Sequence, residues 1–184
     1  MTDTTKPMTL VLDFDNVIHS YVSGWQGVDV IPDPPHKGAF AFIERAMVDF
    51  DVAILSSRSG VEAGRFAMAK WFVRHGFRAD TINWRECQDA APDPASTIDP
   101  NSAEGLARRF NDLPNDMRPA RLLSFPWAKP AAWLSLDDRA MQFNGKWPSM
   151  EVIANFKPWN ARDKKPRKVQ EPANATAAGD QPQE

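Results

Sequence analysis

Acidic side chains follow two apolar segments of this chain, at the points where those segments end. Asp13 and Asp15 follow an apolar run near the N-terminus, and Asp137 and Asp138 follow a later one. Four carboxylates cannot share one crevice without compensation, because like charges repel and raise one another's pKa. A divalent cation is the simplest compensation, and a site built only from oxygen ligands favours Mg²⁺. These acids therefore predict a magnesium site.

Polar groups that suit an anionic ligand occupy similar positions elsewhere in the chain. Ser56, Ser57 and Arg58 follow the apolar run 51–55, and Lys129 lies in a later loop. Cationic side chains and hydroxyl groups bind anionic oxygens through hydrogen bonds, which are strongest where the donor is charged. The combination predicts an anionic ligand at the magnesium site.

The elements that must position these groups alternate between strands and helices. Strands are predicted at residues 8–15, 51–55, 79–84, 121–125 and 132–136. Helices are predicted at 36–50, after a capping box formed by Ser59 and Glu62, and at 149–156. This alternation predicts an α/β fold with a mostly parallel, five-stranded sheet covered on both faces. Ligands of such sheets bind beyond the carboxyl ends of the strands, where the polar groups lie.

Composition narrows the class of protein. The chain has 184 residues, of which 42% are hydrophobic and 25% charged, with a formal net charge of -2, so it suits one globular domain. The charge balance argues against a general DNA-coating protein, and the single Cys87 excludes an internal disulfide framework. No apolar run approaches the ~18 residues of a membrane span, and the acidic N-terminus is unlike a secretory signal. We expect a soluble cytoplasmic protein without a membrane partner, and the sequence does not predict its oligomeric state.

The order of these segments resembles the haloacid dehalogenase (HAD) superfamily of phosphohydrolases. The four family motifs match, in family order, LVLDFDNVI at 10–18, VAILS at 52–56, AKP at 128–130 and LSLDD at 134–138. The segment LDDRAMQFNGKWPS is similar to the fourth motif of small phage and bacterial members. The resemblance implies a Rossmann-like three-layer sandwich with a minimal cap, in which residues 1–156 form the hydrolase domain.

The resemblance also implies a role for each acid. Asp13 would attack phosphorus and form an aspartyl-phosphate, which splits one difficult displacement into two easier ones. Asp15 would protonate the leaving oxygen and then deprotonate the attacking water. The carboxylate of Asp13, the backbone carbonyl of Asp15, and Asp137 and Asp138 would bind Mg²⁺.

Five further positions are candidates for contact with the substrate. By the same resemblance, Ser56 would donate a hydrogen bond to a phosphoryl oxygen, and Lys129 would hold the phosphate as a point charge. Ser57 and Arg58 are the alternative residues for these two roles. His19 lies where the family often has a small flap, so it is a candidate substrate contact, and an ordinary loop histidine is the alternative.

The expected minimal cap bears on the substrate. Residues 85–118 leave room for a small insertion or lid, and residues 157–184 are expected to be a disordered tail with a basic start. Because small metabolites usually need a lid that excludes water, an open crevice favours a nucleotide or a nucleic-acid terminal phosphate. The leading hypothesis is a Mg²⁺-dependent phosphatase. The alternatives are a catalytically weak HAD-fold protein that binds a phosphate ligand or nucleic acid, and a structural protein whose acids are solvated.

Overall fold

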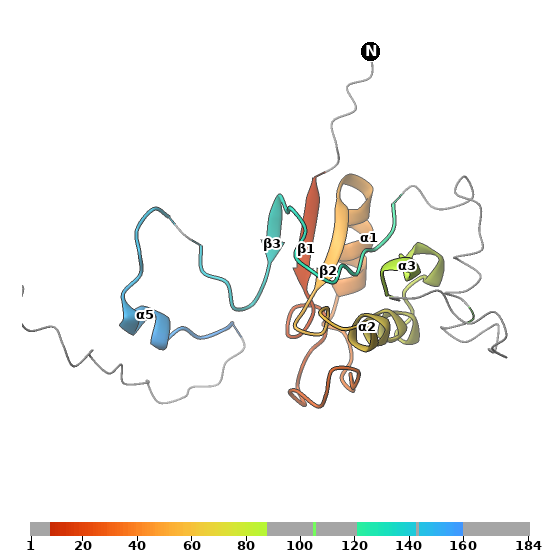
Figure 1. The fold of residues 1–184 in the computed structure, drawn as a ribbon, viewed down its shortest axis with the longest axis horizontal. Helices are drawn as coiled ribbons and strands as arrows, with labels where there is room; N and C mark the ends of the chain where they lie inside the picture. The colour runs from red at the N-terminus through yellow and green to blue at the C-terminus, as the bar shows by residue number, and fades with distance from the viewer. Residues whose placement is uncertain (1–7, 88–104, 106–120, 143, 160–184) are drawn as a thin grey trace, which may run out of the picture. The chain divides into compact units, whose positions relative to one another are not determined.

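A small parallel sheet organises the N-terminal part of the chain. The computed structural model describes residues 8–87, 105, 121–142 and 144–159 (Figure 1). Strand β1 (Thr9–Asp13) lies between β2 (Asp51–Leu55) and β3 (Leu134–Leu136), and all three strands are parallel. The register pairs Leu12 with Ile54 on one side and with Leu136 on the other. The carboxyl ends of the three strands therefore lie at one edge.

Strands β1 and β2 follow from their sequences. The central residues of β1 and β2 are apolar and buried, which is typical of parallel strands covered on both faces. Phe14, directly after β1, is fully buried and packs edge-on against Trp71, with 5.0 Å between ring centroids. The bulky ring thus points into the core, and the strand end is left to the acids on either side of it.

The prediction of an α/β fold with a parallel sheet is confirmed, but the five-stranded sheet is wrong. Residues 79–84 are not a strand, because Ala79–Thr81 form a 3-10 turn (η1) and α3 (Trp84–Cys87) begins after only two further residues. Residues 121–125 make only isolated parallel bridges, Ser124 with Ala53 and Leu123 with Ile82. Too few consecutive residues pair in either segment to extend the sheet. The three-layer, Rossmann-like arrangement stays a prediction.

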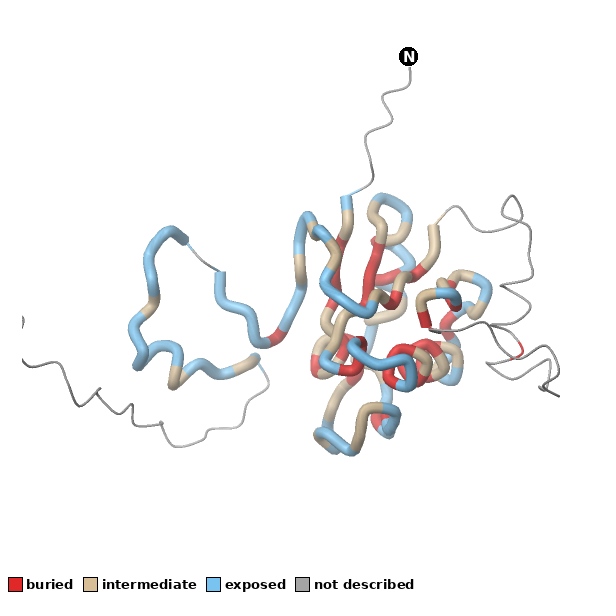
Figure 2. The backbone as a smooth tube through the Cα atoms, viewed as in Figure 1, coloured by how far each residue is buried: buried red, intermediate tan, exposed pale blue. Residues whose placement is uncertain are grey.

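Helices α1 (Ala39–Asp49) and α2 (Glu62–Arg74) confirm the two helical patterns predicted in this region. The core combines the apolar residues of β1 and β2 with an aromatic cluster from α2 and its surroundings, in which Phe40, Phe72 and Phe77 contact one another. Buried residues are concentrated in this region of the tube in Figure 2. Burial of each large side chain contributes roughly 1.5–3 kcal/mol to folding.

The predicted capping box at the start of α2 is wrong. The helix begins at Glu62 with Val61 as its N-cap, and no side chain caps it. Instead, the hydroxyl of Ser59 accepts a hydrogen bond from the backbone N–H of Ser56 over 3.1 Å. Ser59 therefore closes the turn after β2, and the helix starts once that turn is complete.

The chain divides into two units, Met1–Asp138 and Arg139–Glu184, and each is described by itself. In the second unit, α5 (Met150–Ala154) confirms the predicted short helix, and its N-cap Ser149 accepts a hydrogen bond from the backbone N–H of Val152. The division falls before residue 156, the expected end of the domain. Most of the expected lid at 85–118 and of the tail at 157–184 lies outside the described residues.

Candidate active site

Three carboxylates meet at the carboxyl edge of the sheet. Oxygen atoms of Asp13, Asp137 and Asp138 all lie within 4.8 Å of one another. Asp13 ends β1, and the other two follow β3 directly, so the parallel register of the two strands brings the acids together. Asp138 is buried, Asp13 is partly buried and Asp137 is exposed, which leaves the cluster open on one side. The sequence predicted these three acids as metal ligands, and the structure brings them together.

Charge is crowded in this cluster. Burial, together with the charges of Asp137, Asp138 and Asp15, raises the pKa of Asp13 to about 7, although a hydrogen bond from the backbone N–H of Phe14 opposes the rise. That hydrogen bond measures 2.8 Å. Burial is the largest cause of this rise and the neighbouring carboxylates add to it, so a bound cation would favour the ionised form of Asp13. A hard divalent cation fits the all-oxygen donor set of the cluster.

Asn16 joins the turn after β1 to this cluster. Its side-chain amide donates a 2.6 Å hydrogen bond to Oδ2 of Asp138. Asn16 has φ 72°, a left-handed conformation that asparagine tolerates better than most residues. Because the backbone reverses at this point, the backbone N–H groups of Ile18 and His19 both reach the carbonyl of Phe14, at 3.0 and 2.9 Å.

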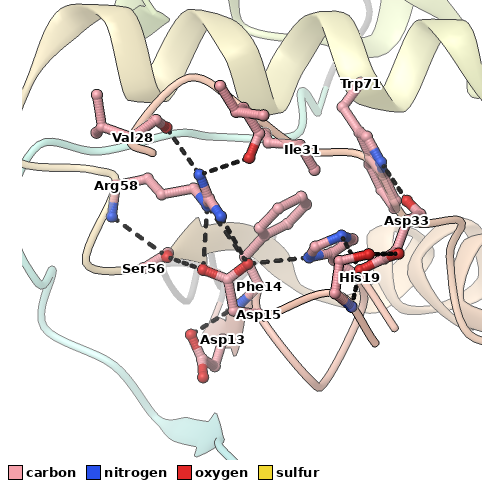
Figure 3. A network of polar contacts seen from close by, with 12 residues as sticks. Asp13, Phe14, Asp15, His19, Val28, Ile31, Asp33, Ser56, Arg58 and Trp71 are labelled. Atoms are coloured by element: carbon pink, nitrogen blue, oxygen red, sulfur yellow. Dashed lines mark hydrogen bonds and ion pairs between the residues drawn. The ribbon is translucent and has the colours of Figure 1, made fainter. Parts of the chain in front are cut away.

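Asp15 lies outside the three-acid cluster. Figure 3 shows its carboxylate turned toward Arg58, Ser56 and His19. The Nε of Arg58 donates to Oδ2 over 3.0 Å, and Nδ1 of His19 lies 2.9 Å from Oδ1. Burial by itself raises the pKa of Asp15, but the hydrogen bonds from His19 and Arg58 outweigh burial and hold the pKa below its usual value. Of the four expected metal ligands, Asp15 is thus the one whose carboxylate is engaged elsewhere.

Arg58 is fully buried and holds a loop as well as Asp15. Its Nη1 donates to the carbonyl oxygens of Gly27 and Val28, at 2.5 and 2.9 Å. The indole of Trp25 covers its guanidinium at 4.5 Å. As a predicted substrate contact, Arg58 presents no exposed surface in this structure, because its donors are directed to Asp15 and to the loop.

His19 is also fully buried, with an exposed fraction of 0%. Its ring stacks on Phe14 with centroids 5.4 Å apart and meets the edge of Trp71 at 5.6 Å. The sequence offered two readings of this residue, a substrate contact or an ordinary loop histidine. The structure instead places it against Asp15, with no surface open to a ligand.

The remaining candidates differ in how they are held. The hydroxyl of Ser56 donates to Oδ2 of Asp15 over 3.3 Å, which places it beside the proposed proton carrier, and Ser57 is exposed. Lys129 is exposed and makes no hydrogen bond or ion pair with the described residues. No contact therefore connects Lys129 to the carboxylates.

A second, partly buried network fixes the segment that leads to Lys129. The carboxylate of Glu86 accepts hydrogen bonds from the hydroxyl of Ser124 and, over 2.9 Å, from the backbone N–H of Phe125. Arg65 donates to the carbonyl oxygens of Glu86 and of Ser59, at 2.9 and 2.8 Å. This network ties the 121–125 segment to α2 and α3.

Sequence reasoning missed two residues of the site. Asn16 follows Asp15 directly, and an asparagine just after a strand is a turn signal, but this signal does not show that its side chain reaches Asp138. Asp33 accepts hydrogen bonds from the backbone and hydroxyl of Ser23, at 2.8 and 2.7 Å, and lies beside His19. No spacing or periodicity in the sequence connects Asp33 to the acids.

Comparison with known proteins finds no matching family model, no matching curated protein and no matching solved structure. Within the described part of the chain, no helix has both the length and the apolar character that a membrane span requires.

Proposed function

We propose that this protein is a Mg²⁺-dependent phosphomonoester hydrolase of the HAD type. The proposal is supported above all by the convergence of Asp13, Asp137 and Asp138 at the ends of two adjacent parallel strands. It is further supported by Asp15, an acid that lies near the cluster in sequence but is held apart from it. This division supplies one carboxylate for the nucleophile and another for proton transfer.

The three clustered acids would hold the cation, together with the backbone carbonyl of Asp15. When bound, Mg²⁺ would neutralise negative charge on the phosphate and reduce its repulsion of the Asp13 carboxylate. Asp13 would serve both as a ligand of the cation and as the nucleophile, since it ends the central strand and is only partly buried.

The reaction would proceed in two displacements. A carboxylate oxygen of Asp13 attacks phosphorus, the bond from phosphorus to the ester oxygen breaks, and the departing oxygen takes a proton from Asp15. A water molecule then attacks the phosphorus of the aspartyl-phosphate and gives its proton to Asp15. The bond between phosphorus and Asp13 breaks, and inorganic phosphate is released. Asp15 is protonated at the end, as at the start.

The lowered pKa of Asp15 shapes its role. Without substrate, Arg58 and His19 keep it ionised at neutral pH. A bound phosphate dianion places negative charge near this carboxylate, which favours its protonated form. The acid role therefore belongs to the substrate complex, and the ionised form is suited to the base role in the second displacement.

Ser56, Ser57 and Lys129 are the proposed phosphate contacts, since Arg58 and His19 are engaged with Asp15. The substrate class we propose is a nucleotide or a nucleic-acid terminal phosphate. A panel of nucleotides, sugar phosphates and phosphorylated oligonucleotides tests this choice separately from the reaction type.

The reaction type is tested by hydrolysis of p-nitrophenyl phosphate with Mg²⁺ and with EDTA. We expect activity only with Mg²⁺, and a loss of roughly 10³-fold or more in Asp13→Asn. Asp51→Asn is the matched control, because it makes the same chemical change at the start of β2, at the opposite edge of the sheet. It should retain wild-type activity.

Two results would overturn the proposal. Equal activity in wild type and Asp13→Asn would exclude Asp13 as the nucleophile. If Mg²⁺ raises the melting temperature of the wild type but no phosphate is released from any substrate of the panel, the protein binds the cation without turnover, as the alternative binding function predicts.

A further inference from the structure

His19 lies between two carboxylates in the core of the N-terminal unit. Its Nδ1 is 2.9 Å from Oδ1 of Asp15, and its Nε2 is 3.7 Å from Oδ2 of Asp33. The imidazole that makes both contacts is fully buried, with an exposed fraction of 0%. The ring therefore connects the acid beside the cluster to an acid in the following loop.

The ring has little freedom to turn. Phe14 stacks on it nearly in parallel, with an interplanar angle of 14°, while Tyr21 and Trp71 meet it edge-on. In a closely packed interior, rotation of the imidazole would require these aromatic neighbours to move as well. Its Nδ1 is thus kept facing Asp15.

Asp33 is held at the far end of this chain of contacts. Its carboxylate accepts hydrogen bonds from the N–H and the hydroxyl of Ser23, at 2.8 and 2.7 Å. Its backbone carbonyl accepts a 2.8 Å hydrogen bond from Nε1 of Trp71 on α2. Asp33 is therefore anchored both within its loop and to a core helix.

The contacts of Arg58 and His19 with the Asp15 carboxylate have a consequence for a metal-dependent reaction. A carboxylate two positions after Asp13 would be attracted to a cation bound by Asp13, Asp137 and Asp138. Once it ligated that cation, it could no longer transfer a proton. Arg58 and His19 offer Asp15 competing partners that keep its side chain out of the cluster.

We propose that His19 and Asp33 are positioning residues for Asp15, with Asp33 orienting His19 and His19 keeping the Asp15 carboxylate in its proton-transfer orientation. This inference rests on the proposed phosphatase function and adds two residues to it. Neither residue contacts the phosphate or the cation. Their contribution appears only where proton transfer by Asp15 limits the rate.

The experiment compares two substrates that differ in their need for a proton. The leaving group of p-nitrophenyl phosphate departs as a stable anion, whereas the alkoxide of glycerol phosphate must be protonated. Asp15→Asn sets the full size of the effect, since loss of a general acid costs roughly 10²–10⁴-fold. The measured quantity is the ratio of kcat/KM for glycerol phosphate to kcat/KM for p-nitrophenyl phosphate, because kcat/KM reports the first displacement, in which the two leaving groups differ.

His19→Phe keeps an aromatic ring against Phe14 and Trp71 but removes both nitrogens. We expect it to lower the ratio at least ~10-fold, with KM changed by less than about twofold. Asp33→Asn should lower the ratio in the same direction by a smaller factor. His19→Asn should restore most of the ratio, because its amide nitrogen can occupy the position of Nδ1 and donate to Asp15. A melting-temperature shift with Mg²⁺ shows in each variant that the protein is folded and its acid cluster intact.

Equal losses on both substrates in His19→Phe and Asp33→Asn would overturn the inference, since a purely structural role affects both reactions alike. If His19→Phe fails to fold, Asp33→Asn gives the same comparison. Failure of the proposed function is distinguishable: the wild type would then hydrolyse neither substrate, and the inference would fall with it.

Discussion

The side-chain amide of Asn16 donates a 2.6 Å hydrogen bond to the carboxylate of Asp138, and this contact joins the turn after β1 to the end of β3. The two residues are far apart in sequence and lie at the edge where the acid cluster forms. Asn16 thereby orients one of the three acids through which we propose that the cation is bound. Its backbone conformation is part of the same arrangement, since its φ is 72°.

Substitution of Asn16 should separate the side-chain bond from the backbone requirement. Both Asn16→Gly and Asn16→Ala lose the hydrogen bond to the buried carboxylate, which costs about 1–3 kcal/mol. Alanine also resists the left-handed conformation, so Asn16→Ala should be less stable than Asn16→Gly by about 1 kcal/mol. Urea denaturation measures the difference. Equal stability of the two variants would contradict the importance of the left-handed turn.

The raised pKa of Asp13 predicts how stability changes with pH in the absence of metal. The folded state holds this proton up to about pH 7, whereas the unfolded chain releases it near the ordinary value of 3.8. The folded state therefore binds more protons between these values, and its stability falls as pH rises from 4 to 7. Three pKa units correspond to roughly 4 kcal/mol, of which solvent screening leaves about 1–2 kcal/mol.

Asp13→Asn should remove this pH-dependent loss. In EDTA, the variant should be more stable than wild type at pH 8 by about 1–2 kcal/mol and close to wild type at pH 4. Urea midpoints at the two pH values measure this, with Asp51→Asn as the control. The same midpoint difference at both pH values would show that Asp13 has an ordinary pKa.

Arg58 should be among the most sensitive positions for stability. Arg58→Met leaves Asp15 without its cationic partner and the carbonyls of Gly27 and Val28 without their donor, so we expect a loss of about 3–5 kcal/mol. Arg58→Lys should restore little, because an ammonium group cannot reach the carboxylate and the carbonyls in the same fork geometry.

Arg45→Met is the matched control for this substitution. Arg45 pairs with Asp49 on α1, and its side chain is 70% exposed, so its loss should change stability by less than about 0.5 kcal/mol. Similar losses at the two positions, measured by chemical denaturation, would contradict the structural role of Arg58.

Gly64 gives a test of the close contact between α2 and the Arg58 turn. A Cβ atom at this position would lie 2.2 Å from the carbonyl oxygen of Arg58. Gly64→Ala should therefore destabilise the protein by about 1–3 kcal/mol, although alanine ordinarily favours a helix over glycine. A Cβ at Gly60 meets no atom within 4 Å, so Gly60→Ala should be nearly neutral. Thermal unfolding distinguishes them, and a stable Gly64→Ala would mean that the turn yields easily.

The site could be predicted from sequence where it depended on strand ends. Asp13, Asp137 and Asp138 follow apolar strands, and parallel pairing alone brings such positions together. The direction of the Asp15 side chain could not be predicted in this way. It depends on the left-handed turn at Asn16 and on long-range partners such as Arg58, which local patterns do not encode.

The same limit applies to the fold. The strands at 8–15 and 51–55 were predictable because continuous apolar runs suit a doubly covered strand. The segment 79–84 resembles a strand in composition, yet only Ile82 makes a bridge, and Trp84 is already part of α3. Tertiary pairing outweighs local propensity in such short segments.

Among the described residues, strand β3 pairs with the sheet along one side only, by three register pairs with β1, and its Leu134 and Leu136 are 52% and 37% exposed. Two of the three clustered acids therefore follow the strand with the fewest register pairs, and the third ends the central strand. A cation bound by all three acids would cross-link β3 to β1. Binding of the cation would then slow amide hydrogen exchange at residues 134–138 when Mg²⁺ is added, even in a variant without catalytic activity.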